Sequence, residues 1–293
     1  LFFLIYALLF ILFIYLLNKK IKQGPYDESD TDSRPLKKLH DLFTMFSMRC
    51  SRIDNGCYWI KYRDKPNLKP MASVYKIHCR EPECVYEYLD GKPRPVYRVC
   101  SPLGYAWVAD AAIKRERLKG LVDYSIPKVP LFVQSHVLYR IHERCRPLHS
   151  WFIEFLMTVA TVKGDIIKSN TGKLLLKIEF SKKLSLGYLV MEPMKDKLVG
   201  RTFLFVTQSG TPEGDRLSDI LKLYPREKKY LELDRLETYL KTDILKDSLL
   251  SGIFKRCGIE NMPELQKMFR FNELEPCALN VRKYLQLDAL TID

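Results

Sequence analysis

The chain has 293 residues, with 48 Lys and Arg against 35 Asp and Glu, which gives a formal net charge of +13. This length allows one large domain or two modest ones with a core of their own, so disulfide bonds are not required for folding. The eight cysteines show no regular spacing, which argues against a disulfide-rich secreted scaffold and favours free thiols. The positive balance favours an acidic partner such as nucleic acid, anionic lipid or an acidic protein, with a merely soluble basic surface as the alternative.

The first segment, residues 1–17, is apolar and uncharged, and Lys19, Lys20 and Lys22 follow it. A helix of this length, at about 1.5 Å per residue, is near the short end of what crosses a bilayer. A signal peptide would have basic residues before the apolar run and a small-x-small cleavage site after it, and neither is present. The pattern predicts a single-pass transmembrane anchor, and the positive flank predicts that the body of the protein lies in the cytoplasm.

Two further parts precede the centre of the chain. Residues 18–38 are polar, contain prolines and lack apolar periodicity, so we expect a flexible tether. Residues 39–126 are predicted to be a β-rich N-terminal part, because the stretch from Cys57 to Val99 is rich in Tyr, Val and Ile and is broken by Pro and Gly. A short helix is expected before that stretch, from Leu39 to Met48. Within this part, two strand-like runs flank the turn pair Asp90-Gly91, and Tyr105 to Leu118 has the pattern of an amphipathic helix that becomes basic toward its end.

The central part, residues 127–208, is predicted to be an α+β domain. An extended run up to Val133 precedes a helix that begins near Ser135 and ends before Pro147, and a second helix covers residues 151–162. Four strand-like runs follow, whose order implies an antiparallel meander: Asp165–Lys168, Lys173–Phe180, Ser185–Met191 and Lys197–Thr207.

The last part, residues 209–293, carries Leu and Ile at helical spacing and is predicted to be helical. Its expected helices are Asp215–Leu223, Tyr230–Leu240, Asp243–Phe254 and Pro263–Phe269. Thr211 is the expected N-cap of its first helix, with Pro212 at the first helical position. The whole chain is therefore predicted to be α+β, with an anchor, a β-rich part, a helix pair on a meander and a helical C-terminal part.

The most distinctive constellation is the run of basic residues His136, Arg140 and Arg144. On a helix these residues are at i, i+4 and i+8, so their side chains lie along one face. Like charges at this spacing destabilise a helix, and a bound phosphate would relieve that cost because guanidinium groups bind two of its oxygens. The alternative is that the arginines pair with Glu143, Glu154 or Glu213 and that the histidine only caps or packs.

This His-x3-Arg-x3-Arg helix, followed by a second helix and a meander containing Arg201, resembles the layout of RelE/BrnT-like ribonuclease toxins and their phage-associated relatives. The resemblance covers about residues 129–207. It implies that RNA is cleaved by attack of its own 2′-hydroxyl, with His136 transferring a proton and with Arg140, Arg144 and Arg201 stabilising charge on the phosphate. The chain departs from the family in its apolar N-terminal segment and in the parts on either side of this region.

No metal or cofactor is expected. The Cys and His residues that suggest zinc lack a paired Cys-x2-Cys knuckle: Cys50, Cys57, His78, Cys79 and Cys84. Aromatic residues are frequent, at 17 Tyr, 15 Phe and 3 Trp, and some interleave with basic residues, a pattern that suits base stacking as well as half-buried strands.

Two function classes follow from these patterns. One is a membrane-anchored basic protein that binds or cleaves RNA through the His136 to Arg144 helix. The other is a non-catalytic anchored scaffold that binds an acidic protein or anionic lipid. The first requires the three residues of the helix and Arg201 to converge in one open cleft, whereas the second is favoured if they disperse into separate ion pairs.

Overall fold

The computed structural model describes residues 84–102, 108–148, 150–181, 184–259, 262–269 and 273–287. Its strands are β1 Cys84–Leu89, β2 Lys92–Arg98, β3 Cys100–Pro102, β4 Val108–Asp110, β5 Ala112–Lys114, β6 Lys128–Val133, β7 Ile166–Lys168, β8 Leu174–Ser181, β9 Leu184–Pro193 and β10 Leu198–Phe205. Its helices are the 3-10 turn η1 Arg115–Leu118, α5 Ser135–Cys145, α6 Ser150–Lys163, α7 Pro212–Leu221, α8 Pro225–Tyr230, α9 Leu236–Lys241, the 3-10 turn η2 Asp243–Leu245, α10 Ser248–Arg256, α11 Met262–Phe269 and α12 Ala278–Tyr284. The α+β class is confirmed.

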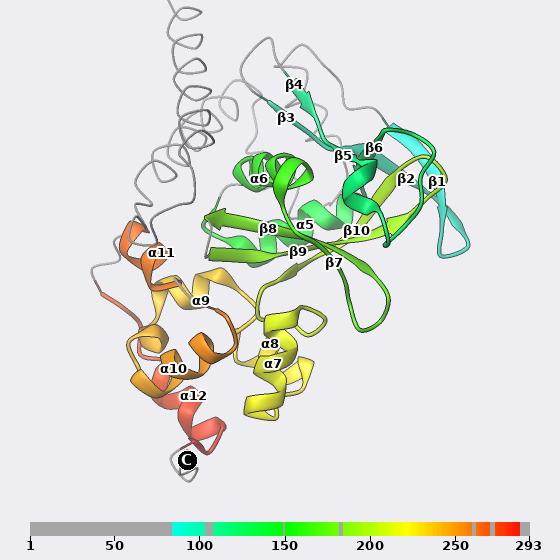
Figure 1. The fold of residues 1–293 in the computed structure, drawn as a ribbon. Helices are drawn as coiled ribbons and strands as arrows, with labels where there is room; N and C mark the ends of the chain where they lie inside the picture. Colours follow the sequence, from blue (N-terminus) through cyan, green and yellow to red (C-terminus); the bar gives the residue numbers. More distant parts are fainter. Residues whose placement is uncertain are drawn as a thin grey trace, which may run out of the picture.

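A mixed sheet organises the fold, with strand order β1-β2-β6-β10-β9-β8-β7 and with β5 paired to β6 (Figure 1). The predicted meander is confirmed, because β7, β8, β9 and β10 pair antiparallel in succession. The pair β6 and β10 is parallel, as the long connection through α5 and α6 between these strands allows. The sheet continues across the boundary predicted at residue 127, since β1, β2 and β5 belong to it.

The predicted hairpin between β1 and β2 is also confirmed. Asp90 and Gly91 form its two-residue turn with φ values of 54° and 72°. Positive φ at both central residues is what a tight hairpin turn with the right-handed twist of its strands requires, and Asp-Gly tolerates it well.

Helices α5 and α6 cover one face of the sheet and share its main core. Val137, Leu138 and Ile141 of α5 are fully buried there, and the same core continues into the C-terminal helices. Figure 1 shows α7 to α12 gathered on one side of the sheet, in the lower half of the view. The rings of Phe205 at the end of β10 and Tyr239 of α9 lie 6.0 Å apart, so the sheet and the C-terminal helices form one packed unit.

The helix predicted for residues 105–118 is wrong. The described part of this segment forms β4, β5 and η1, and Ala112 of β5 pairs with Pro130 of β6. Ala111 and Ile113 are buried while Lys114 is exposed, which is the alternation of a strand. Arg117 donates to the Thr161 and Gly164 carbonyls. This side chain therefore caps free carbonyl groups at the C-terminal end of α6.

The prediction of a membrane-spanning helix has to be corrected to this extent: within the part of the chain that the structure describes, no helix is long and apolar enough to cross a membrane. The predicted anchor at residues 1–17 and the predicted tether at residues 18–38 lie outside the described residues, as do the elements predicted between residues 39 and 83.

In the C-terminal part, the single helix expected from Tyr230 to Leu240 is interrupted. A turn containing Glu232, at a φ of 53°, separates α8 from α9. The N-cap prediction at Thr211 is confirmed, since its hydroxyl accepts a hydrogen bond from the Gly214 amide at 2.9 Å.

The close packing of β9 against β10 predicts that a side chain at Gly187 would destabilise the protein. This residue has a φ of 152°, and an added Cβ would lie 2.0 Å from the Leu204 carbonyl oxygen of β10. Gly187→Ala should therefore lower the free energy of unfolding by more than about 2 kcal/mol in urea titration. Gly252→Ala in α10 is the matched control, because nothing lies within 4 Å of its Cβ position. It should leave stability unchanged or raise it by up to about 1 kcal/mol, and equal losses in both variants would contradict this packing.

Candidate functional site

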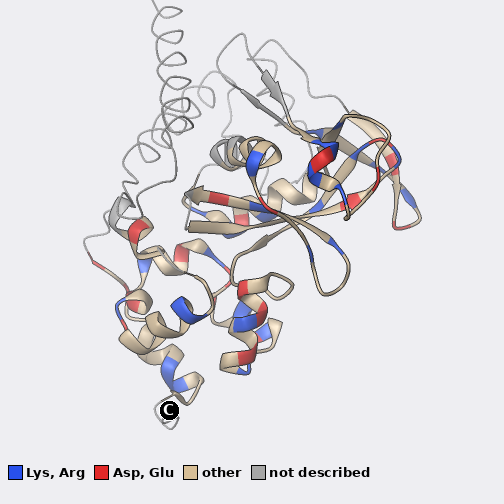
Figure 2. Cartoon of the chain, viewed as in Figure 1, with Lys and Arg blue, Asp and Glu red and all other residues tan. Residues whose placement is uncertain are grey.

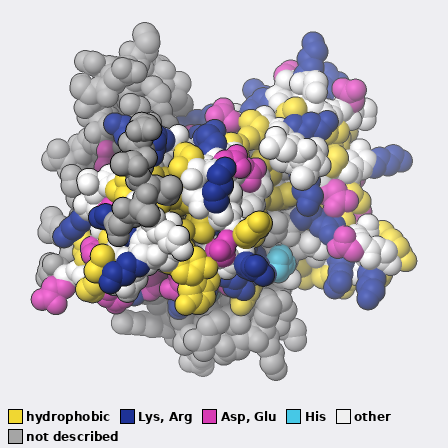
Figure 3. All heavy atoms as spheres, turned by 90° about the horizontal axis from the view of Figure 1, so that it is seen from below, with side chains coloured by type: hydrophobic (Ala, Val, Ile, Leu, Met, Phe, Trp, Pro, Cys, Tyr) yellow, Lys and Arg dark blue, Asp and Glu magenta, His cyan; other side chains and the backbone are white. Residues whose placement is uncertain are grey.

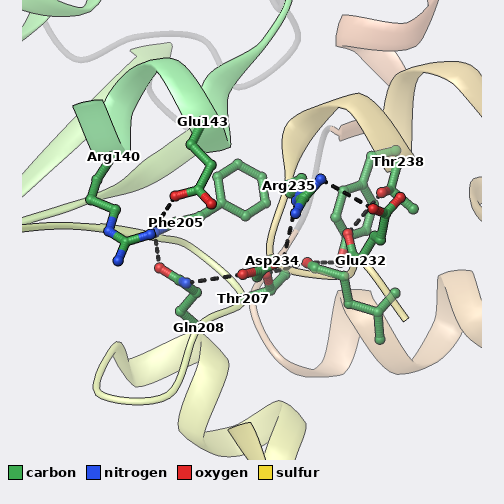
Figure 4. Close-up of polar contacts among 11 residues, drawn as sticks. Arg140, Glu143, Phe205, Thr207, Gln208, Glu232, Asp234, Arg235 and Thr238 are labelled. Carbon is green, nitrogen blue, oxygen red and sulfur yellow. Dashed lines mark hydrogen bonds and ion pairs between the residues drawn. The ribbon is translucent and has the colours of Figure 1, made fainter. Parts of the chain in front are cut away.

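The predicted helix of basic residues exists as α5, and its three candidates lie together on it. The inward face of α5 is apolar, so His136 and Arg140 lie toward its outer side and Arg144 lies in its last turn. Arg140 Nε donates to His136 Nε2 at 3.3 Å, and its NH1 pairs with the Glu143 carboxylate (Figure 4). Arg140 therefore already has the carboxylate partner that the alternative interpretation assigned to it.

Arg144 is held more tightly than Arg140. Its NH1 donates to the carbonyl oxygen of Phe203 in β10, which ties the end of α5 to the sheet. The pKa of Arg144 is lowered to about 10, mainly by burial and also by the nearby charge of Arg140, while Glu143 and Asp234 act in the opposite direction. A guanidinium in this environment remains charged near neutrality and stabilises the junction of helix and sheet.

His136 has a pKa below its ordinary value. Local desolvation is the largest cause, and the positive charges of Arg140 and Arg144 add to it. The imidazole is therefore mainly neutral at pH 7, which agrees with its role as acceptor for Arg140 Nε. The nitrogen that would take a proton from a ribose hydroxyl already accepts this hydrogen bond.

Arg201 has a different set of partners. It lies on β10 at the bulge between Gly200 and Thr202, and its guanidinium pairs with Asp90 in the turn of the β1–β2 hairpin and with Glu192 of β9. These pairs fix the hairpin to the sheet. The four candidate residues thus fall into two separate groups, with three along α5 and the fourth in ion pairs of its own.

A polar cluster that the sequence did not reveal lies between α5 and the loops that follow β10 and α8 (Figure 4). Gln208 donates to the Asp234 carboxylate at 3.3 Å and accepts the Phe205 amide at 2.9 Å. Asp234 is 8% exposed, and Arg235 Nε lies 3.9 Å from its second oxygen. Residues from three segments meet here, so no local spacing in the sequence could have indicated the cluster.

Lys228 is the most unusual charged group among the described residues. This side chain is 1% exposed, and its ammonium donates to the carbonyl oxygens of Thr207 and Gly214 and to the Ser209 hydroxyl at 3.4 Å. Burial lowers its pKa from 10.5 to about 8. All three acceptors lie in or next to the β10–α7 loop, so the lysine fastens α8 to that loop.

Glu213, another carboxylate considered as an arginine partner, accepts hydrogen bonds from Tyr188 instead. Its two oxygens lie 3.0 and 3.1 Å from the Tyr188 hydroxyl, which donates to the carboxylate in the interior. Among the described residues, no group of three or more His, Cys, Asp or Glu side chains could hold a metal ion. Of the cysteines and the histidine considered for zinc, only Cys84 belongs to the described part of the chain.

The candidate arginines already bind oxygen atoms of the protein itself. Arg140, Arg144 and Arg201 each donate to an oxygen of the chain, which reduces what they can offer to a phosphate. The arrangement therefore suits a structural junction better than a site that stabilises developing charge in a reaction.

A comparison of two arginines tests this assignment. Arg144→Ala should lower the free energy of unfolding by about 2 to 4 kcal/mol, because it leaves buried acceptors and carboxylates without their cation. Arg140→Ala, which removes a half-exposed ion pair on the same helix, should cost less than about 1 kcal/mol. Urea titration of both variants measures the difference, and an equal or reversed order would contradict the structural role of Arg144.

Lys228 predicts an unusual pH dependence of stability. Between about pH 8 and pH 10.5 the unfolded chain keeps this proton while the folded chain has released it, so unfolding takes up a proton. Raising the pH across this window should therefore stabilise the wild type relative to Lys228→Met. The readout is the difference in the free energy of unfolding between the two proteins, and a difference that stays flat or falls with pH would contradict the buried charge.

Comparison with known proteins gave no match: no family model, no curated protein and no solved structure is similar to this chain. The resemblance to RelE/BrnT-like toxins therefore stays a prediction.

Proposed function

We propose that this chain is a basic protein that binds single-stranded nucleic acid, with RNA as its ligand, and that it does not cleave what it binds. The observation that carries the proposal is a set of strongly exposed tyrosines in a chain with a surplus of cations. The set consists of three residues in or next to the C-terminal helices, whose exposed fractions range from 44% to 74%: Tyr224, Tyr230 and Tyr284. Exposed aromatic rings stack on unpaired bases, and surrounding cations bind the phosphates.

The charge distribution supports binding along an extended surface. Lys and Arg outnumber Asp and Glu by 13, which gives the formal net charge of +13. On the face seen in Figure 3, Lys and Arg side chains are spread among apolar and acidic ones, without one dense basic block. A strand several nucleotides long can contact cations spaced in this way, whereas a single phosphate cannot.

Cleavage is not part of the proposal because of the partners that the candidate catalytic residues already have. Arg144 holds a backbone carbonyl of β10, and the imidazole of His136 accepts from Arg140. Cleavage by this helix would require these bonds to break before a phosphate could take their place, at the cost of a buried unpaired charge.

A second candidate function, a scaffold for another protein, is favoured by the separation of Arg201 from the basic residues of α5 and by one feature of the sheet. Among the described residues β1 pairs only with β2, so it forms an edge of the sheet, and its outward face exposes Tyr86 and Tyr88. An extended segment of a partner could add to such an edge.

Binding and cleavage can be measured in one experiment on the full chain. A fluorescent uridine-rich RNA of about 12 nucleotides should bind, with an affinity that falls by an order of magnitude or more between about 50 and 200 mM salt. His136→Ala should bind equally well, and the RNA should remain intact with either protein. His136-dependent cleavage would contradict the non-catalytic assignment, and no binding at low salt would contradict nucleic-acid binding and favour the scaffold.

A further inference from the structure

We propose that the nucleic-acid strand binds on the surface formed by α8 and α12, with Tyr230 and Tyr284 stacking on bases and with Arg226, Lys229 and Lys283 holding phosphates. We call these five residues, together with Tyr224, the α8–α12 surface. The inference rests on the proposed function and names the site at which it acts.

The buried side chain of Lys228 determines how α8 presents its other residues. In this short helix Lys228 is the buried residue, held by the Thr207 carbonyl of the β10–α7 loop and by the Gly214 carbonyl of α7. Since its ammonium points inward, Arg226, Lys229 and Tyr230 are left exposed. The sequence Pro225–Tyr230 thus places two cations and one aromatic ring on the solvent side within about two turns of helix.

Two tyrosines from distant parts of the chain meet at this surface. The rings of Tyr230 in α8 and Tyr284 in α12 have centroids 5.6 Å apart and planes tilted by 35°. They nevertheless remain 74% and 44% exposed. The pair therefore leaves aromatic surface open to solvent, and exposed aromatic rings can stack on unpaired bases.

The Tyr284 ring is held in place by its hydroxyl, which donates to Glu227 at 3.3 Å. The same carboxylate accepts the Tyr224 amide at 2.7 Å, so the one acidic residue of α8 is occupied by the fold. The pKa of Tyr284 lies above its ordinary value through desolvation and the charge of Glu227, with Arg226 opposing the shift, which indicates that Arg226 is close to the ring pair.

The charges around the tyrosines are mainly positive. Arg226 precedes Tyr230 by four residues and therefore shares its side of the helix, Lys229 is next to Tyr230, and Lys283 is next to Tyr284. Figure 2 shows basic segments on the ribbons of the C-terminal helices that carry this surface. Three exposed cations beside two open rings match the alternation of phosphates and bases in a single strand.

The β1 edge has tyrosines of equal exposure but lacks this arrangement. Tyr86 and Tyr88 face Pro95 and Pro93 across the hairpin, so their neighbours on that face are prolines. The cation Lys197 pairs with Glu87, whose side chain alternates to the other face of β1. The difference favours α8–α12 as the nucleic-acid surface and makes β1 a matched control.

The test uses the full chain in a non-ionic detergent and the same fluorescent RNA. Tyr230→Ala/Tyr284→Ala should weaken binding at least about tenfold, whereas Tyr230→Phe/Tyr284→Phe, which keeps the rings, should bind within about threefold of the wild type. Tyr86→Ala/Tyr88→Ala, which removes two equally exposed rings elsewhere, should bind like the wild type. Circular dichroism and thermal melting verify that each variant is folded.

A charge series provides an independent readout. Arg226→Ala/Lys229→Ala should reduce the slope of log affinity against log salt by about 1.4, that is about 0.7 for each lost phosphate contact on a single strand. Lys114→Ala/Lys128→Ala removes the same charge from the exposed pair on β5 and β6 and should leave the slope unchanged.

The outcomes separate the two proposals. One outcome is that the wild type binds RNA while Tyr230→Ala/Tyr284→Ala and Arg226→Ala/Lys229→Ala bind as tightly and with the same salt dependence. In that case the proposed site is wrong and nucleic-acid binding stands. The site is also wrong if the β1 tyrosine variant loses as much affinity as the α8–α12 variant. If the wild type does not bind RNA at low salt, the proposed function itself fails.

Discussion

The structure depends on one buried charge, the ammonium of Lys228. A cation that is 1% exposed is stable only where the chain supplies acceptors. Here the β10–α7 loop provides the Thr207 carbonyl and the Ser209 hydroxyl, and the first turn of α7 provides the Gly214 carbonyl. This requirement joins the last strand of the meander to the helical part and fixes which side of α8 faces water. The aromatic and basic residues of the α8–α12 surface are exposed as a consequence of it.

The need of a buried cation for acceptors within the protein also explains why α5 does not provide an open phosphate site. Arg144 is largely desolvated, so it must find an acceptor within the protein, and the end of β10 supplies the Phe203 carbonyl. Arg140 and Arg201, which are more accessible, bind carboxylates that neutralise them. Arg144 thus ties α5 to the sheet and Arg140 is neutralised within α5, whereas the cations proposed to bind RNA lie exposed on α8 and α12.

Much of the secondary structure follows from local sequence. The Asp90-Gly91 turn, the meander and the cap at Thr211 each have a short-range cause, and all three are confirmed. The amphipathic pattern around Ala112 predicts a helix, yet pairing with β6 prevails. The partners of the candidate residues could not be predicted, because Arg144 meets a residue 59 positions away and Tyr230 meets one in the last described helix. Charge and periodicity identify basic residues, but only tertiary packing decides which of them remain open.

The most direct test of the account is to locate the RNA on the protein. The full chain would be photocrosslinked to a single-stranded RNA that carries 5-iodouridine, and the crosslinked peptides would be identified by mass spectrometry. The account predicts crosslinks at Tyr230 or Tyr284, since iodouridine reacts with the aromatic rings on which it stacks. Crosslinks concentrated on α5, at His136 or Tyr139, would contradict it and return the site to the helix of basic residues.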